Sequence, residues 1–555
     1  MGDAADETGA TPATRRRWWM LDPLGSLLGF TLSVLSVTPS LVPRPAVMQG
    51  AVAALAFAVG YLVGAAVWVL VRRLLGVRVP GRGSPLFWVL FSVVWLGAFA
   101  LLAERATAWQ DEVRALVEMR PLGGPDLGAF AAGFLPLVVL LLTIGRGVRR
   151  MYTGLRRTIG TPLAAGGSGL IVIAGTTAVL MITMAVLDGV YLGRNGAPDA
   201  DAVEPPSAYR SAGPGSAISW DHLGRHGANF VGGGPSAAEI TVLTGVEAKQ
   251  PIRVYAGVAS AESLKERASL VVDELERTGA FDRRVLVVAT TTGSGWLEAQ
   301  TVDALEYLLA GDTAIAAMQY SYLPSWASSV FDPELPQDAA RILFDAVSEA
   351  WRSRPEGDRP LLISYGLSLG ALGAQSVFAD LDDLRARTDG AMFVGSPNGA
   401  TLWRSLQAAR DEGSPAWRPV LDRGSEVRWI SRAGDEKLLT GPWREPRVLY
   451  LQHATDAVTW LAPELLWRSP DWLEPAQRGA DVSPSMRWIP VVTAMQVLVD
   501  MLVGEAVPAR HGHNFGDVVL TGWREVVGDP GLSEAGFARV QTEIESYAPI
   551  PPGDE

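Results

Sequence analysis

The segment Tyr365-Gly366-Leu367-Ser368-Leu369-Gly370 places a serine between two glycines at the spacing G-x-S-x-G. An apolar run over 361–365 predicts a strand before it, and the residues from 369 onward predict a helix. Such a turn exposes the serine hydroxyl at a helix N-terminus, where the helix dipole favours developing negative charge. We therefore expect Ser368 to be a nucleophile for acyl transfer. The alternative is a structural serine in a tight turn.

A serine nucleophile needs a histidine base and an acid that orients it, and in this setting they follow in the order acid, then histidine. Asp456 comes just after a predicted strand over 448–451. His511 and His513 lie on a loop before a predicted helix over 515–527. We expect Asp456 to be the acid, although it could simply cap a helix. Either histidine could be the base, and His513 is favoured because it lies next to the following helix.

Stabilisation of the oxyanion requires two backbone N–H groups. One should belong to Leu369, the residue after the nucleophile. The second is expected from the glycine-containing loop after a predicted strand over 285–289, where Thr292 and Gly293 are the candidates. This reaction needs no cofactor and no metal. The absence of cysteine also excludes thiolate metal sites and cysteine nucleophiles.

The elements around these residues alternate between strands and helices. This order predicts an α/β domain with a mainly parallel sheet covered on both faces. The predicted strands are 285–289, 313–318, 361–365, 391–394 and 448–451, and the predicted helices include 261–278, 337–351 and 369–378. An aromatic-rich stretch over 460–472 is expected either to pack in the core or to form a lid or acyl groove beside Asp456.

The first part of the chain has a different character. It contains five apolar stretches of nearly the length that a membrane-spanning helix needs, at 23–42, 47–71, 85–103, 127–145 and 168–187. We therefore predict a multi-pass membrane domain over 1–192, a Gly/Pro-rich linker over 193–218 and an α/β domain over 219–555. Ionisable residues are nearly absent inside the stretches, which favours anchoring over transport.

Arginine placement predicts the orientation of these spans. Twelve arginines lie before the first stretch or in alternate connections, against four on the opposite side. The positive-inside rule then predicts a cytoplasmic N-terminus and an extracytoplasmic catalytic domain in the cell membrane. The twelve are Arg15, Arg16, Arg17, Arg72, Arg73, Arg78, Arg82, Arg146, Arg149, Arg150, Arg156 and Arg157. Trp18 and Trp19 would suit the membrane interface beside the first stretch.

The chain resembles the α/β-hydrolase superfamily. More narrowly, it is similar to an actinobacterial multi-pass membrane family that joins an α/β-hydrolase N-terminal (membrane) domain to an α/β-hydrolase catalytic domain. The resemblance is carried by the elbow around Ser368 and by the segments 38–41, 292–296, 319–326, 450–456 and 511–513. It implies a serine hydrolase fold and supplies no substrate. The chain departs from such relatives at Leu367 and Arg510.

These observations together predict a membrane-anchored, esterase- or lipase-like serine hydrolase with a Ser-Asp-His triad. The expected substrate is an acyl ester that is part of a lipid or bound to the cell envelope. An acyltransferase using the same acyl-enzyme is an alternative, and so is a non-enzymatic membrane protein with a degenerate hydrolase domain. A net charge of −12 without a basic tract argues against nucleic-acid binding. The sequence does not indicate an oligomeric state.

Overall fold

The computed structural model describes residues 21–75, 85–200 and 202–547. Arg15, Arg16, Arg17, Trp18, Trp19, Arg78 and Arg82, which entered the orientation argument, lie outside these residues. The described chain divides into two compact units. One contains the described residues of Met1–Val37, Ala46–Arg105 and Asp126–Ile144, and the other contains Thr38–Pro45, Ala106–Pro125 and the described residues of Gly145–Glu555. We call the second the hydrolase unit.

A seven-stranded sheet forms the centre of the hydrolase unit, with the strand order β1-β3-β2-β4-β5-β7-β6. Every neighbouring pair is parallel, as the alternating pattern predicted. All five predicted strands are present, and β1 and β6 are additional. The strands are β1 (Ile252–Ala256), β2 (Val285–Thr290), β3 (Thr313–Met318), β4 (Leu361–Leu367), β5 (Gly390–Val394), β6 (Val427–Ile430) and β7 (Arg447–Leu451).

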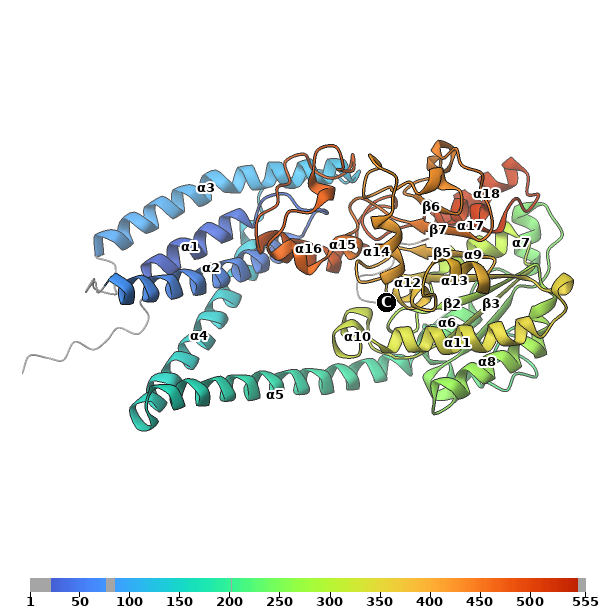
Figure 1. The fold of residues 1–555 in the computed structure, drawn as a ribbon, viewed down its shortest axis with the longest axis horizontal. Helices are drawn as coiled ribbons and strands as arrows, with labels where there is room; N and C mark the ends of the chain where they lie inside the picture. Colours follow the sequence, from blue (N-terminus) through green and yellow to red (C-terminus); the bar gives the residue numbers. More distant parts are fainter. Residues whose placement is uncertain (1–20, 76–84, 201, 548–555) are drawn as a thin grey trace, which may run out of the picture. The chain divides into compact units, whose positions relative to one another are not determined.

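Helices cover both faces of the sheet (Figure 1). One layer is built from α8 (Leu264–Thr278), α11 (Leu335–Arg352) and α12 (Leu369–Ser376), and the other from α9 (Ala299–Leu308), α17 (Val519–Val527) and α18 (Glu534–Glu545). Because both faces are covered, β1, β2, β3 and β5 are buried along their whole length. The remaining helices of this domain are α6 (Gly224–Gly232), α7 (Ala237–Thr244), α10 (Ser325–Phe331), α13 (Leu381–Arg387), α14 (Thr401–Ala408), α15 (Ala457–Trp460) and α16 (Val492–Asp500).

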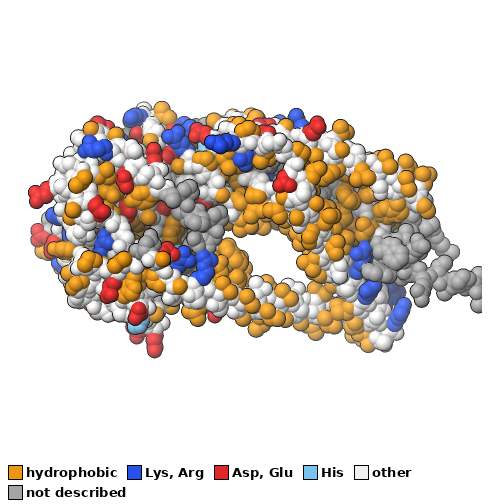
Figure 2. Space-filling model, turned by 180° about the vertical axis from the view of Figure 1, so that it is seen from behind, with side chains coloured by type: hydrophobic (Ala, Val, Ile, Leu, Met, Phe, Trp, Pro, Cys, Tyr) orange, Lys and Arg blue, Asp and Glu red, His pale blue; other side chains and the backbone are white. Residues whose placement is uncertain are grey.

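Four helices among the described residues are long and apolar enough to cross a membrane. They are α2 (Ala46–Leu75), α3 (Pro85–Leu116), α4 (Leu127–Ile159) and α5 (Thr161–Asn195). Hydrophobic side chains cover these helices, whereas acidic side chains gather over the sheet domain (Figure 2). This distribution is that of a membrane protein with a water-facing domain.

The first predicted span differs from the expectation. Its residues form α1 (Pro23–Leu35), a helix of only 13 residues. At about 1.5 Å per residue it is roughly 20 Å long, less than the ~30 Å hydrocarbon core. The helix ends because polar residues and Pro39 follow Leu35. Gly60 and Gly64 of α2 let α1 pack closely, since a Cβ at either position would lie within 2.6 Å of an α1 carbonyl oxygen.

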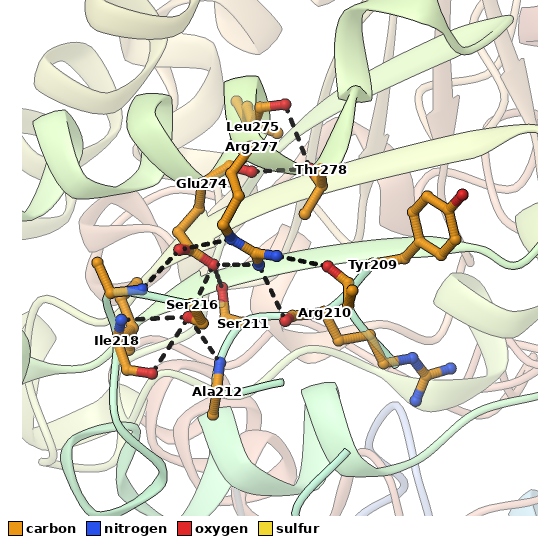
Figure 3. Close-up of polar contacts among 12 residues, drawn as sticks. Tyr209, Arg210, Ser211, Ala212, Ser216, Ile218, Glu274, Leu275, Arg277 and Thr278 are labelled. Carbon is orange, nitrogen blue, oxygen red and sulfur yellow. Dashed lines mark hydrogen bonds and ion pairs between the residues drawn. The ribbon is translucent and has the colours of Figure 1, made fainter. Parts of the chain in front are cut away.

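Residues 193–218 were predicted to be a linker, and much of this segment is fixed to the hydrolase unit. The Glu274 carboxylate of α8 accepts hydrogen bonds from the Ala217 amide at 3.0 Å and the Ser216 hydroxyl at 2.8 Å (Figure 3). Arg277 bridges Glu274, at 2.7 Å, to the Arg210 carbonyl oxygen, at 3.1 Å. The end of this segment therefore does not behave as a free tether.

Candidate active site

Ser368 lies on the sharp turn between β4 and α12, as the sequence predicted. Its backbone has φ 55° and ψ −122°, in the left-handed region that L-residues rarely occupy. The two glycines allow this turn because a Cβ at Gly366 would lie 2.3 Å from the Gly370 carbonyl oxygen. A Cβ at Gly370 would lie 2.3 Å from the Thr290 carbonyl oxygen at the end of β2. The serine is thus held in a strained backbone conformation typical of nucleophile elbows.

Asp456 and His513 form a buried pair. Asp456 lies beyond the end of β7, and its Oδ2 accepts a hydrogen bond from His513 Nδ1 at 2.8 Å. A carboxylate can only accept, so the proton is on Nδ1 and Nε2 can act as a base. Nε2 has no hydrogen-bond partner among the described residues. Asp456 also accepts from the Val458 amide at 2.9 Å, so it caps α15 as well as orienting the histidine.

The His513 ring lies next to the end of β5, the strand that pairs with β4. A Cβ at Gly395, just after β5, would lie 2.3 Å from His513 Cε1, so only glycine leaves room for the ring. The preceding residue, Val394, accepts a hydrogen bond from the Ser368 amide at 2.9 Å. Ser368 and His513 are therefore both positioned by the end of β5. The Ser368 hydroxyl makes no hydrogen bond to His513 within the described chain, and such contacts commonly tighten only when substrate binds.

The second candidate base, His511, has a different acid. Its Nδ1 lies 3.0 Å from Asp481 Oδ2 in a pair that is also buried. Gly512 lies between the two histidines with φ 55°, and this turn directs the rings to different carboxylates. His453, behind the loop, donates from Nδ1 to the Gly512 carbonyl oxygen at 3.0 Å. Burial lowers the pKa of His453 to about 4, so it supports the loop as a neutral side chain. The geometry favours His513 as the base.

Two further carboxylates surround His513, and the sequence analysis did not identify them. Glu298 is the N-cap residue of α9 and is buried, and burial raises its pKa. Burial likewise raises the pKa of Glu505 to about 7. Burial lowers the pKa of His513, but the charge and hydrogen bond of Asp456, with the charges of Glu505 and Glu298, raise it overall. Neither glutamate belongs to a spacing pattern that could have revealed it.

The candidate oxyanion donors differ in their availability. The Leu369 amide makes no hydrogen bond to another described residue, as an oxyanion donor requires. The Thr292 amide donates to the Trp296 carbonyl oxygen at 3.1 Å, and the Gly293 amide donates to Ser325 Oγ at 3.1 Å. Either of these bonds would have to be released before its amide could bind an oxyanion.

The aromatic-rich stretch over 460–472 is mainly part of the core. Trp460 and Trp472 are buried with ring centroids 5.6 Å apart, and Trp460 Nε1 donates to the Ala454 carbonyl oxygen. Leu466 and Trp467 are exposed in the same stretch. Leu466 and Trp467 are therefore the large apolar side chains of this stretch that could contact another molecule.

Comparison with known protein families gives two matches. Residues 252–540 match the model described as "Alpha/beta-hydrolase family", and residues 37–235 match "Alpha/beta-hydrolase family N-terminus". Comparisons with curated proteins and with solved structures gave no match. The first model spans the parallel sheet, the elbow and both histidine–aspartate pairs, and the second spans the long apolar helices. The chain therefore belongs to this α/β-hydrolase family and carries the family's distinct N-terminal region.

Proposed function

We propose that this protein is a membrane-anchored serine hydrolase that cleaves an acyl ester. The observation that carries the proposal is the buried Asp456–His513 pair, which leaves Nε2 without a hydrogen-bond partner among the described residues, while the end of β5 contacts both His513 and the strained Ser368. An intact set of three groups in the order of the hydrolase fold favours an enzyme over a degenerate, purely structural domain.

The proposed reaction follows from these positions. His513 Nε2 accepts the proton of the Ser368 hydroxyl as Oγ attacks the ester carbonyl carbon. The Leu369 amide donates to the resulting oxyanion. The protonated His513 then gives its proton to the leaving alcohol, and an acyl-serine remains. Water, deprotonated by His513, attacks the acyl-serine and releases the acid, while the proton returns to Ser368.

The substrate of this proposal is an ester in a lipid or in the cell envelope. A hydrolase held by several membrane helices gains most from a substrate that stays near the membrane. The hydrolase unit includes 38–45, which precedes α2, and 106–125, which contains the end of α3 and most of its connection to α4. Both contact the sheet domain, since Glu112 accepts from Ser485 Oγ at 2.9 Å and Arg44 pairs with Asp500 at 3.3 Å. These contacts fix both segments to the sheet domain.

The extracytoplasmic orientation is part of the same proposal. α2 to α5 cross in succession, so the 38–45 and 106–125 connections and the end of α5 share one membrane face. The opposite ends of α2 and α4, together with the segment that follows α2, carry nine arginines, Arg72, Arg73, Arg78, Arg82, Arg146, Arg149, Arg150, Arg156 and Arg157. The positive-inside rule assigns these arginines to the cytoplasm and the sheet-containing part of the chain after α5 to the outside. The short α1 affects only the side on which the N-terminus lies.

A fluorophosphonate probe tests the enzymatic proposal, because it modifies only an activated serine. The full-length wild-type protein should be labelled, and Ser368→Ala should not. Ser376→Ala is the matched control, since this hydroxyl on the same helix only donates to the Gly373 carbonyl oxygen. Absence of labelling in the wild-type protein, or labelling that persists in Ser368→Ala, would refute the proposal.

A further inference from the structure

Among the large apolar side chains exposed on the hydrolase unit, two groups lie on elements that adjoin the candidate active site. Trp326 and Val330 of α10 form the first, which we call the α10 patch. The α16 patch lies on α16 and on the short helices packed beside it, η7 (Pro463–Leu466) and η9 (Met501–Val503). It consists of Leu466, Trp467, Leu498 and Leu502. Val330 is 67% exposed and Trp467 is 64% exposed, so these large apolar groups face outward rather than toward the core.

The α10 patch lies beside the end of a membrane helix. Tyr322, three residues before α10, donates from its hydroxyl to Asp188 Oδ1 of α5 at 2.6 Å. Gln319 Nε2 donates to Asn195 Oδ1, at the last residue of α5, at 2.8 Å. Asp188 and Asn195 follow the apolar part of α5, where the helix leaves the hydrocarbon core. The segment that leads into α10 is thereby held at the membrane surface.

The α16 patch is fixed to the beginning of another membrane helix. Asp500, between Leu498 and Leu502, accepts from the Leu41 amide at 3.0 Å and pairs with Arg44 at 3.3 Å. Arg44 is two residues before the first residue of α2. The start of α2 and the end of α5 lie on the same membrane face because four spans separate them. Both patches are therefore placed at one surface of the bilayer.

The elements that carry the two patches are each linked to a loop of the candidate active site. Ser325, the first residue of α10, accepts the hydrogen bond of the Gly293 amide in the oxyanion loop. Gly504, next to η9, accepts from the His513 amide at 2.7 Å. An element that carries exposed apolar side chains thus adjoins each half of the catalytic machinery.

We propose that the α10 patch and the α16 patch both insert into the lipid leaflet next to the hydrolase unit. Short helices with exposed Trp, Leu and Val side chains are suited to the headgroup–acyl boundary. The residues after 192 carry a net charge of −18. Apolar insertion, rather than attraction to anionic headgroups, therefore drives the contact. Building on the proposed function, the site then receives an ester from a lipid of that same leaflet.

The chain contains no cysteine, so a single engineered cysteine can report on one position. We would label Val330→Cys and Leu502→Cys with bimane in the full-length protein. Val242→Cys is the matched control, because Val242 of α7 is 85% exposed and belongs to neither patch. The proteins are placed in phosphatidylcholine nanodiscs with or without phospholipid that carries a doxyl quencher high on its acyl chain.

Doxyl lipid should reduce the bimane emission at positions 330 and 502 by about twofold or more and leave position 242 nearly unchanged. Quenching at 330 or 502 that is no stronger than at 242 overturns the proposal. Weak quenching at these positions overturns the proposal regardless of whether a second copy of the chain, another protein or water covers the patch. Quenching at only one of positions 330 and 502 overturns the claim that both patches contact lipid.

Activity provides a separate measurement. Val330→Asp and Leu502→Asp should lower turnover of a bilayer-embedded ester at least tenfold and leave a short water-soluble ester within about twofold. Equal loss on both esters overturns lipid entry through the patches. Fluorophosphonate labelling of Ser368 distinguishes the two proposals: quenching without labelling refutes the hydrolase, and labelling without quenching refutes only the lipid contact.

Discussion

The buried pair of Arg44 and Asp500 provides the sharpest prediction for stability. Both side chains are fully buried, with Nε 3.3 Å from Oδ1. Asp500 also accepts from the Leu41 amide at 3.0 Å and from the Ser40 hydroxyl. Burial lowers the pKa of Arg44 and raises the pKa of Asp500, and their mutual attraction opposes both changes. Each charge therefore depends on the other to remain in the interior.

Replacement of one partner should be costly. Arg44→Met leaves a buried carboxylate with only neutral donors, and breaking a buried pair in this way costs about 3–5 kcal/mol. For a domain of this size the loss corresponds to a decrease in Tm of roughly 5–15 °C. Asp500→Asn in the Arg44→Met background removes the orphaned charge, so the double variant should recover a large part of the loss. Thermal unfolding of full-length protein in detergent, followed by intrinsic fluorescence, measures Arg44→Met, Asp500→Asn and the double variant.

The pH dependence of the same variant has a defined sign. Without Arg44, the folded-state pKa of Asp500 rises further above its unfolded value. The folded state then binds a proton more tightly than the unfolded state, and stability is lost as pH rises through that pKa. The loss of unfolding free energy caused by Arg44→Met, relative to the wild-type protein, should therefore become smaller toward acid pH.

An exposed ion pair serves as the control for this experiment. Arg341 and Asp338 lie 3.0 Å apart with each side chain about half exposed, and Arg341→Met should cost less than about 1 kcal/mol. The reasoning is refuted if Arg44→Met unfolds within about 1 °C of the wild-type protein. It is equally refuted if the double variant loses as much stability as the two single variants added together.

The remaining predictions concern the base, its titration and the topology. His513→Ala should lower kcat by about 10⁴-fold or more, whereas His511→Ala should act mainly on stability; near-normal turnover of both would exclude this loop as the source of the base. His513 must be neutral to accept a proton and its pKa is raised, so kcat/KM should fall on the acid side at a pH above about 6.5. Glu505→Gln should move that fall to lower pH, and an unchanged profile would contradict a role for the Glu505 charge. A C-terminal reporter should be active only outside the cytoplasm, and activity of a cytoplasm-specific reporter would reverse the orientation.

The elbow could be predicted because its requirements are local in the sequence. Gly366, Ser368 and Gly370 lie within five residues, and the flanking strand and helix have clear apolar patterns. Asp456 could be placed because it follows a recognisable strand. The choice between His511 and His513 depends on where each ring points after the Gly512 turn, and no spacing rule contains that information.

The two strands that the sequence analysis missed both contain an arginine. β1 includes Arg253, which is buried and pairs with Glu306 at 2.7 Å. β6 includes Arg428, which pairs with Glu525 at 2.8 Å. A charge in a short run suggests a surface segment, and its burial becomes understandable only when the partner is known. The partners lie 53 and 97 residues away in the sequence, so the local pattern could not predict these strands.

The same long-range contacts change how the membrane region should be understood. A fragment beginning after α5 would lose Arg44, Ser40 and Leu41 and would leave Asp500 buried without its partners. It would also lose Glu112, which accepts from Ser483 Oγ at 2.6 Å. Poor activity of such a fragment would therefore reflect a damaged hydrolase unit as much as distance from the membrane.

Substitutions in the full-length chain avoid this ambiguity. The Arg44→Met/Asp500→Asn double variant removes the charges at the junction without leaving either one buried alone. Val330→Asp and Leu502→Asp change the surface toward lipid and leave that junction intact. If turnover of embedded esters depends on the patches but not on the charged pair, the membrane helices act mainly by holding the active site at the bilayer. If turnover of embedded esters depends on the Arg44–Asp500 pair even after stability is restored, the α1–α2 connection also positions the histidine loop through Asp500 and Gly504.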